Sequence, residues 1–315
     1  MVQILELFGG IGSPRIALRN LGVDVKAIDY VEIDEKAVRS YNAIFHKEIK
    51  YKTQNVVGYN LKPDILIHGS PCQDFSIAGY QKGADEGSET RSSLMWETIH
   101  IIQQMGVWKP RIVIWENVKN VLSKHMRHNF NRYLDEMQKL GYISNYEVLN
   151  AMDFGLPQNR NRVFTISCLD GTLFNFETLE KSPMRNIKEF LQDHVSEEYE
   201  VTQPSILNVI GKKGLKRATI IKDYSYTITE RQDRCPTQVI DLGNGKYRFL
   251  TDLECWRLQG YTDEDYYNAA KVNNKRALYK QAGNSIPVPI FESIFKQIIE
   301  KENSNNKKDI QLITA

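Results

Sequence analysis

Hydrophobic positions follow two alternating patterns over residues 1–170. Short apolar runs rich in β-branched residues predict strands at residues 4–8, 25–28, 65–68, 112–115 and 163–167. Between these runs, apolar residues recur at helical spacing at residues 14–21, 35–45, 92–105 and 127–140. Short strands that alternate with longer helices are typical of a parallel, doubly wound α/β sheet.

The alternation stops near residue 171, where prolines and glycines interrupt segments of mixed polarity. We therefore expect a second, smaller region to begin there. Helical signals return at residues 252–258, and an amphipathic pattern at residues 286–300 predicts a closing helix. The polar residues 301–308 are expected to fray.

Composition sets limits but does not indicate a function. With 41% hydrophobic residues among 315, the chain is able to bury a core. Its four cysteines have no C-x-x-C spacing, which predicts a reduced, cytoplasmic setting and neither a disulfide framework nor a metal cluster. No apolar run is long enough to cross a bilayer and no basic leader precedes the first strand, so we expect a soluble, unsecreted protein. The formal charge is only +2, so any nucleic-acid surface depends on local clustering.

A glycine-rich turn, Phe8-Gly-Gly-Ile-Gly12, lies between the first predicted strand and its helix. Ser13 as N-cap and Pro14 at the first helical position predict where that helix begins. Glycines there allow a ligand to approach the backbone, but nucleotide oxidoreductases use the same device, and the full G-x-G-x-x-G pattern is absent. Glu32 follows the second strand at about the distance at which an acidic residue binds ribose hydroxyls. A solvated carboxylate at a strand end is an equally good interpretation.

The sequence Pro71-Cys72-Gln73 places a thiol where the third strand runs out into a loop. A lone cysteine is more often a core residue than a nucleophile. Three further motifs follow it in order, namely Trp115-Glu-Asn-Val118, Gln158-Asn-Arg-Asn-Arg162 and Gln281-Ala-Gly-Asn-Ser285.

Together with the glycine turn, these motifs make the chain resemble the DNA (cytosine-5) methyltransferases, from Phe8 to about residue 290. The resemblance implies a doubly wound mixed sheet of the S-adenosylmethionine-dependent methyltransferase type, with a second, smaller target-recognition domain. Residues 1–185 and 270–315 would form the catalytic and cofactor-binding domain, and residues 186–269 the small domain and hinge. The implied activity is methyl transfer to carbon 5 of a flipped-out cytosine in a specific double-stranded DNA sequence.

The resemblance also assigns catalytic roles. Cys72 would add to carbon 6 of cytosine, because this addition turns the ring into an enamine that is able to attack a methyl donor. Glu116 would donate to ring nitrogen 3, since an apolar pocket favours the protonated carboxyl group. Arg162 would face the target base and Arg160 would support it. Taken alone, Glu116 is more simply a capping or salt-bridging residue, and the base that removes the carbon 5 proton is not identified.

The implied cofactor is S-adenosylmethionine. Its methionine end would lie near the glycine turn and near Asn284 and Ser285, its ribose at Glu32 and its adenine against Ile33. Asn55 stands where the family usually has an aspartate, and a polar helix N-cap is the alternative role for Asn284 and Ser285. The full set of expected cofactor-binding residues is Phe8, Gly10, Ile11, Gly12, Glu32, Ile33, Asn55, Pro71, Leu94, Asn284 and Ser285.

Double-stranded DNA is the expected partner. The loop at residues 74–91 would close over a flipped base, although its glycines also fit an ordinary exposed loop. A basic stretch within residues 205–222 would bind phosphates, or is simply a solvated face. The expected DNA-binding residues are Gln73, Ser76, Lys212, Lys213, Lys216 and Arg217.

Several alternatives stay open at this stage. Transfer RNA is a rival substrate for the same chemistry. A catalytically idle DNA-binding regulator and a nicotinamide oxidoreductase are rivals from other classes. A monomer is expected, and a separate restriction endonuclease is a candidate partner.

Overall fold

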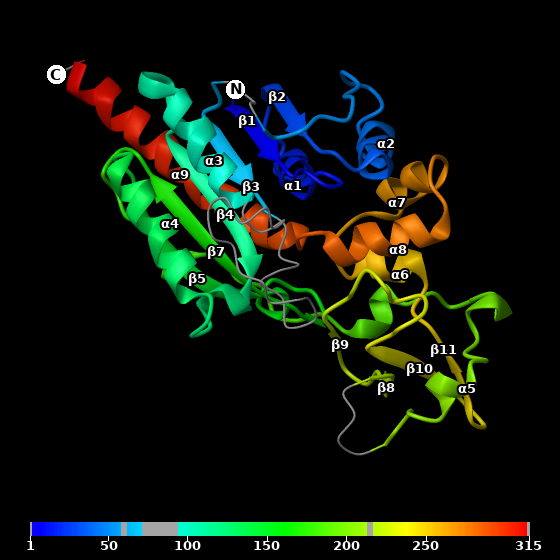
Figure 1. The fold of residues 1–315 in the computed structure, drawn as a ribbon. Helices are drawn as coiled ribbons and strands as arrows, with labels where there is room; N and C mark the ends of the chain where they lie inside the picture. The colour runs from blue at the N-terminus through cyan, green and yellow to red at the C-terminus, as the bar shows by residue number, and fades with distance from the viewer. Residues whose placement is uncertain (1, 58–61, 71–93, 213–216, 314–315) are drawn as a thin grey trace.

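A central mixed sheet organises the larger part of the molecule (Figure 1). The computed structural model describes residues 2–57, 62–70, 94–212 and 217–313, with side chains described as far as residue 301 except at 26–28. Over these residues the sheet has six strands. In spatial order they are β2 (Val25–Val31), β1 (Val2–Leu7), β3 (Ile65–His68), β4 (Ile112–Val118), β7 (Asn161–Cys168) and β5 (Ile143–Asn150).

The strand directions explain why the sheet is mixed. β1 pairs in parallel with β2 and β3, and β3 pairs in parallel with β4, as the alternation of strands and helices predicted. β7 instead runs antiparallel to β4 and β5. Only residues 151–160 connect β5 to β7, and a connection without a crossover helix leads to antiparallel pairing. The edge strand β5 was absent from the prediction because it is largely polar and half-exposed.

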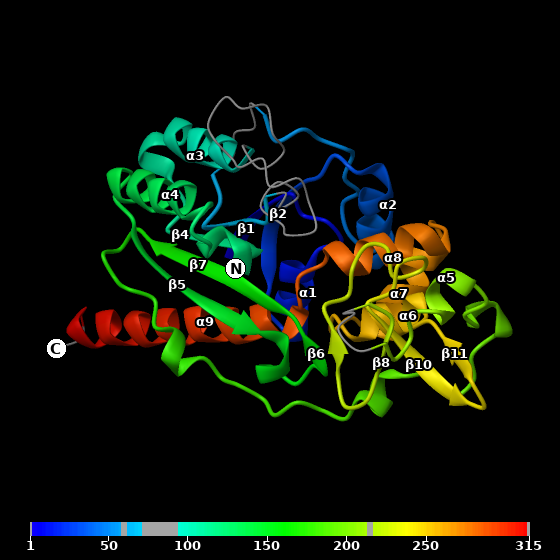
Figure 2. The same ribbon diagram turned by 60° about the horizontal axis from the view of Figure 1, so that its bottom comes forward.

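Helices cover both faces of the sheet (Figure 2). One face packs against α1 (Ser13–Asn20) and α9 (Val288–Ile313), and the other against α3 (Leu94–Gln104) and α4 (Arg127–Lys139). Alternation along β1 follows from this, since Ile4 belongs to the first core and Leu5 to the second. The closing helix predicted at residues 286–300 is α9, and it packs against α1 at the start of the chain.

A smaller unit lies beyond the carboxyl end of β4 and the amino end of β7 (Figure 1). Its strands are β8 (Thr219–Ile220), β10 (Gln238–Gly243) and β11 (Lys246–Arg248), and it includes α5 (Pro204–Leu207). A separate pair, β6 (Gln158–Asn159) and β9 (Ser225–Tyr226), joins it to the larger unit. The small unit has a core of its own, made of Val201, Ile206, Ala218, Val239 and Phe249.

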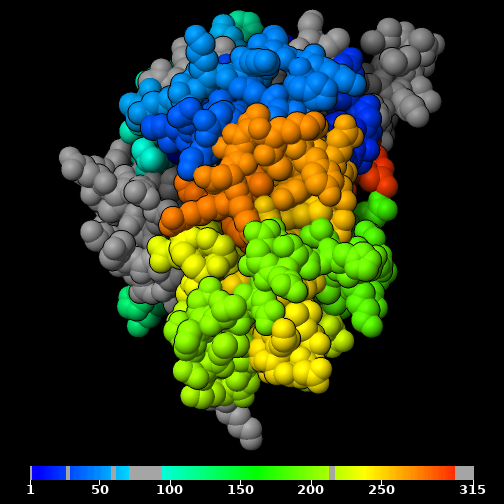
Figure 3. All heavy atoms as spheres, turned by 90° about the vertical axis from the view of Figure 1, so that its right-hand side faces the viewer, coloured from blue at the N-terminus to red at the C-terminus, as the bar shows by residue number. Residues whose placement is uncertain are grey.

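Three helices lie between the two units, where Figure 3 shows them in yellow to orange below the blue N-terminal part. They are α6 (Asp252–Arg257), α7 (Asp263–Ala270) and α8 (Lys275–Asn284). α7 packs on α2 (Glu35–Ile44), and α8 leads directly into α9. The helical signal at residues 252–258 is confirmed by α6. No helix in the described part of the chain has the length and apolar character of a membrane span.

Short 3-10 helices complete the connections. They lie at Gly106–Trp108, Lys119–Leu122, Ala151–Asp153, Phe176–Thr178, Ile187–Phe190 and Glu197–Tyr199.

Candidate active site

A tight glycine turn follows β1. Phe8, Gly10 and Gly12 have φ values of 56°, 56° and 81°. Glycine adopts this left-handed region without a side-chain clash, whereas it is rare for a residue such as Phe8. Gly12 is the N-cap of α1, so the helix begins at Ser13 with Pro14 in its first turn. The prediction of Ser13 as N-cap was wrong by one residue, because its hydroxyl bonds to groups far away in the sequence.

Glu32 connects the end of β2 to this turn. One carboxylate oxygen accepts from the backbone N–H of Gly10 at 2.9 Å, and the other accepts from Ile33 and Asp34, each at 2.8 Å. The carboxylate is therefore held by three backbone donors and is not merely solvated. Ile33 beside it is 70% exposed, and Asn55 is exposed with its side-chain oxygen accepting from the backbone of the same loop. The ribose and adenine roles of these residues stay predictions.

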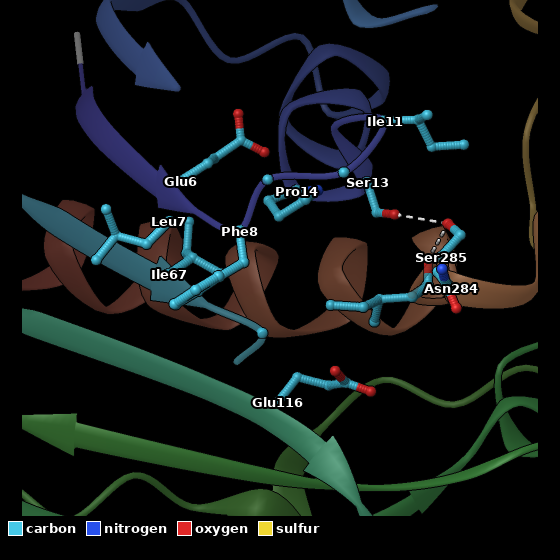
Figure 4. Close-up of a pocket in the computed structure, with 14 residues that line it drawn as sticks. Glu6, Leu7, Phe8, Ile11, Ser13, Pro14, Ile67, Glu116, Asn284 and Ser285 are labelled. Atoms are coloured by element: carbon cyan, nitrogen blue, oxygen red, sulfur yellow. Dashed lines mark hydrogen bonds between the residues drawn. The ribbon is translucent and has the colours of Figure 1, made fainter. Parts of the chain in front are cut away.

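A pocket opens where the glycine turn meets the carboxyl ends of β3 and β4 and the segment after α8 (Figure 4). The carboxyl ends of parallel strands are where ligands bind in open α/β sheets. Of the expected cofactor residues, Asn284 is exposed at the rim and Ser285 is buried, while Leu94 is half-buried at the start of α3. The lining consists of Glu6, Leu7, Phe8, Gly9, Gly10, Ile11, Ser13, Pro14, Ile67, Gly69, Glu116, Asn284, Ser285 and Ile286.

Glu116 enters this pocket from β4. It is 8% exposed, and Arg162 of β7 pairs with it across the two strands, with 3.1 Å between Nε and Oε1. Burial raises the pKa of Glu116, although the charges of Arg162 and Arg160 oppose that shift. A Cβ added to Gly69 would lie 3.6 Å from the other carboxylate oxygen, so Glu116 reaches the backbone three residues before Cys72.

Arg160 has different partners from Arg162. It is 2% exposed, and its guanidinium donates to the carbonyls of Ile228, Gly283 and Ser285 at 3.0, 3.0 and 2.7 Å. One of these carbonyls comes from the small unit, one from the last turn of α8 and one from the segment after α8. Arg160 therefore connects the two units, and a supporting catalytic role for it stays a prediction.

Three buried hydroxyls form a closed group that the sequence did not reveal. Ser13 Oγ lies 2.6 Å from Tyr261 Oη and 3.0 Å from Ser285 Oγ, and Tyr261 Oη lies 2.5 Å from Ser285 Oγ. Both serines line the pocket, whereas Tyr261 lies behind them, between α6 and α7. Ser13 and Tyr261 are 248 positions apart in the sequence, and Tyr261 and Ser285 are 24 apart, so no local sequence pattern indicated this contact.

Glu6 is another residue of this pocket that the sequence did not reveal. It is 1% exposed within β1, and burial raises its pKa from 4.5 to about 7. Tyr41 donates to one of its carboxyl oxygens at 2.8 Å and in turn accepts from Arg15 at 3.1 Å. The other oxygen is buried without a hydrogen-bond partner among the described residues. An acidic residue inside the apolar run of β1 was the available signal.

Ser70 is held at the end of the loop that leads from β3. Trp115 donates its indole N–H to Ser70 Oγ at 3.2 Å, and Asn117 donates to the Ser70 carbonyl at 3.4 Å. Trp115 also stacks on His68, with 2° between the ring planes. Burial lowers the pKa of His68 to about 3, so it is neutral. The backbone two residues before Cys72 is therefore anchored to β4 on either side of Glu116.

Several predicted residues lie outside the described part of the chain, namely Cys72, Pro71, Gln73, Ser76, Lys213 and Lys216. Lys212 and Arg217 are exposed in the small unit. Cys168 and Cys255 are core residues, and burial raises the pKa of both thiols. Cys235 is exposed.

Comparison with known proteins decides the family. Residues 2–300 match the protein family described as C-5 cytosine-specific DNA methylase. The chain belongs to this family. The expectation of a DNA (cytosine-5-)-methyltransferase is thereby confirmed at the level of the family.

Relatives of this C-5 cytosine-specific DNA methylase align over nearly the whole chain. Type II methyltransferase M2.ScrFI of Lactococcus lactis subsp. cremoris is 30% identical and covers 96% of this chain and 100% of its own. Orphan methyltransferase M.SPBetaI of Bacillus phage SPbeta is 27% identical, covering 95% of this chain and 97% of its own.

The fold prediction is confirmed by solved structures. The S. pombe Dnmt2 methyltransferase superposes with a TM-score of 0.77 at 19% identity, covering 96% of this chain and 100% of that one. The Entamoeba histolytica methyltransferase EhMeth gives a TM-score of 0.77 at 18% identity, with coverages of 96% and 98%.

Proposed function

We propose that the protein transfers a methyl group from S-adenosylmethionine to carbon 5 of a flipped-out cytosine in a specific double-stranded DNA sequence, through a covalent adduct of Cys72 at carbon 6. The observation that carries this proposal is the Glu116–Arg162 pair. Glu116 of this pair lines the pocket at the glycine turn, and it lies next to Gly69, three residues before Cys72.

The residues present suit S-adenosylmethionine. The pocket is lined by Ser13 and Ser285, which carry hydroxyls, and by the glycine turn, whose backbone a ligand is able to approach. Outside the pocket, Glu32 and the exposed Ile33 provide a carboxylate and an apolar surface next to the glycine turn. When bound there, the cofactor supplies an electrophilic methyl group.

The chain's own residues would then act on the base. The Cys72 thiolate forms a bond to carbon 6, and the electrons of the 5,6 double bond move toward ring nitrogen 3. Protonated Glu116 donates to nitrogen 3, which stabilises the charge that arrives there. Arg162 holds the Glu116 carboxyl group and provides further N–H donors for the ring carbonyl. After methylation, loss of the carbon 5 proton to a base returns the electron pair to the ring, and the Cys72 sulfur leaves.

Target recognition is assigned to the small unit. We propose that residues 1–185 and 270–315 form the catalytic and cofactor-binding domain and that residues 186–269 form the recognition domain and hinge. Lysines and arginines of the basic stretch, Lys212, Lys213, Lys216 and Arg217, would neutralise phosphates, and Gln73 and Ser76 would contact DNA beside the flipped base.

The direct test is Cys72→Ala with S-adenosylmethionine and mixed-sequence DNA. We expect methylation to be lost while the cofactor still binds, because the thiol acts on the base alone. DNA that contains 5-fluorocytosine at the mapped target site should form a stable adduct with the wild-type protein, since fluorine at carbon 5 prevents proton loss, and none with Cys72→Ala. Cys235→Ala, which changes an exposed cysteine, serves as the matched control. Near-normal turnover by Cys72→Ala would refute the proposal, and methylation of transfer RNA in place of DNA would redirect it.

A further inference from the structure

The cluster of three hydroxyls from Ser13, Tyr261 and Ser285 leaves one hydrogen available for a ligand in the pocket. Each hydroxyl carries one hydrogen, so three hydrogens serve three oxygen–oxygen contacts. The two shortest contacts, 2.6 and 2.5 Å, both involve Tyr261. Tyr261 therefore donates to one serine and accepts from the other. The contact between the two serines is the longest of the three, at 3.0 Å.

The surroundings fix the position of Tyr261. Its side chain is 4% exposed, and its ring packs against Trp256 with 5.0 Å between centroids. Ser285 is fixed as well, because its backbone carbonyl accepts from Arg160 at 2.7 Å and its N–H donates to Ala282. One serine donates its hydrogen to Tyr261, and the other has only the 3.0 Å contact with its partner serine for its hydrogen. The hydroxyl of this second serine is able to turn toward the pocket.

Ser13 is in the better position to donate. It is the first residue of α1, which has no side-chain cap at its N-terminus. The positive end of a helix favours an anion there. Ser285 has the Ile286 carbonyl as an additional acceptor at 3.4 Å, and Ser13 has no such second acceptor among its hydrogen bonds in the described residues. Glu6 also lines this pocket, although its carboxyl group is buried beneath the glycine turn.

We propose that Ser13 binds the carboxylate of the cofactor's amino-acid end and that Tyr261 is a positioning residue, which holds Ser13 and Ser285 so that the Ser13 hydrogen points to that carboxylate. This inference rests on the proposed function. It adds Ser13 and Tyr261 to the cofactor site, from segments that lie at the start of α1 and between α6 and α7.

The test compares the binding of S-adenosylmethionine with that of its decarboxylated form, because the two compounds differ only in the carboxylate. Ser13→Ala should weaken the binding of S-adenosylmethionine about 10-fold or more, the usual effect of losing a hydrogen bond to a charged group. It should leave binding of the decarboxylated compound unchanged. Tyr261→Phe should weaken only the first compound as well, by roughly 3-fold to 10-fold. The double variant should bind like Ser13→Ala, since Tyr261 acts through Ser13.

Controls separate this role from a structural one. Tyr279→Phe removes another buried tyrosine hydroxyl, one that donates to the Leu250 carbonyl at 2.6 Å away from the pocket, and should leave both affinities unchanged. Ser293→Ala removes the hydroxyl of another buried serine, one that donates to the Glu180 carbonyl, and should also leave both affinities unchanged. Thermal unfolding of each variant checks folding, and Tyr261→Phe carries the test if Ser13→Ala does not fold.

The outcomes are distinguishable. If Ser13→Ala and Tyr261→Phe weaken both compounds equally, or neither, the inference is overturned while the proposed function stands. A wild-type protein that binds neither compound would overturn the proposed cofactor and this inference together.

Discussion

Glu116 and Arg162 lie on adjacent antiparallel strands and pair through a buried contact of 3.1 Å between Nε and Oε1. Arg162 uses one N–H for the carboxylate and another for the backbone carbonyl of Asn161, at 2.8 Å. Burial and the arginine charges act in opposite directions on the pKa of Glu116, and burial has the larger effect. The pair thus keeps a carboxyl group in position without fixing it in the ionised state.

Glu116→Gln tests the proton-donating role. The amide has nearly the same shape, but it cannot transfer a proton to ring nitrogen 3. We expect the single-turnover rate of methylation to fall by about 100-fold or more, which is typical for loss of a general acid. Affinity for S-adenosylmethionine should change little. Glu136→Gln, on the surface of α4, is a suitable control, and an unchanged rate in Glu116→Gln would remove Glu116 from the mechanism.

The pH dependence gives an independent check of Glu116. Because its pKa is raised, the protonated fraction declines as pH increases through that raised value. The rate of methyl transfer should therefore lose a Glu116-dependent contribution at higher pH. That part of the profile should be absent in Glu116→Gln, and a limb that persists in the variant would belong to another group.

Local motifs were enough to find some of the site and not the rest. Glu116 and Arg162 each lie in a short motif with a strand beside it, so the sequence showed both their types and their places. The bonds from Arg160 to the carbonyls of Ile228 and Gly283 join segments separated by 68 and 123 residues. Such contacts depend on tertiary packing, which one sequence does not encode in any local pattern.

The same limit explains the differences in the fold. The parallel strands β1, β3 and β4 have apolar runs that are largely buried, so their pattern is strong. β5 is a half-exposed edge strand in which polar and apolar residues do not alternate regularly, and its pattern is correspondingly weak. The N-cap of α1 moved by one residue because Gly12 has the required backbone conformation while the Ser13 hydroxyl is bonded elsewhere.

Gly283→Ala tests the junction between α8 and the small unit. A Cβ at this position would lie 2.2 Å from the backbone nitrogen of Glu230 and 2.3 Å from the carbonyl carbon of Thr229. Backbone atoms cannot move aside as a flexible side chain would, so the two segments must separate. We expect the free energy of unfolding to decrease by about 2 kcal/mol or more. Chemical denaturation measures this change.

Gly171→Ala is the matched control for that variant. Gly171 has a φ of 76°, but no described heavy atom lies within 4 Å of an added Cβ. Its substitution should cost only the left-handed backbone strain, about 1 kcal/mol. Equal effects of the two substitutions would show that the contact with residues 229–230 is not close in solution.

Glu6→Gln tests how the buried carboxyl group under the glycine turn affects stability. The folded-state pKa of Glu6 is raised from 4.5 to about 7, so the native state binds this proton more tightly than the unfolded state does. The stability of the wild-type protein should accordingly fall as pH rises from about 4.5 through about 7, by on the order of 3 kcal/mol.

His68, whose pKa is lowered to about 3, has the opposite effect on stability below its ordinary pKa of 6.5. The difference between wild type and Glu6→Gln cancels the His68 contribution, because the histidine is present in both. Denaturation curves at closely spaced pH values should show that difference growing in favour of the variant between pH 4.5 and 7 and levelling off above, since Gln keeps the acceptor for Tyr41 without titrating. A difference that does not change with pH in that window would mean that Glu6 is already ionised in the folded protein, with Arg15 as its counter-charge.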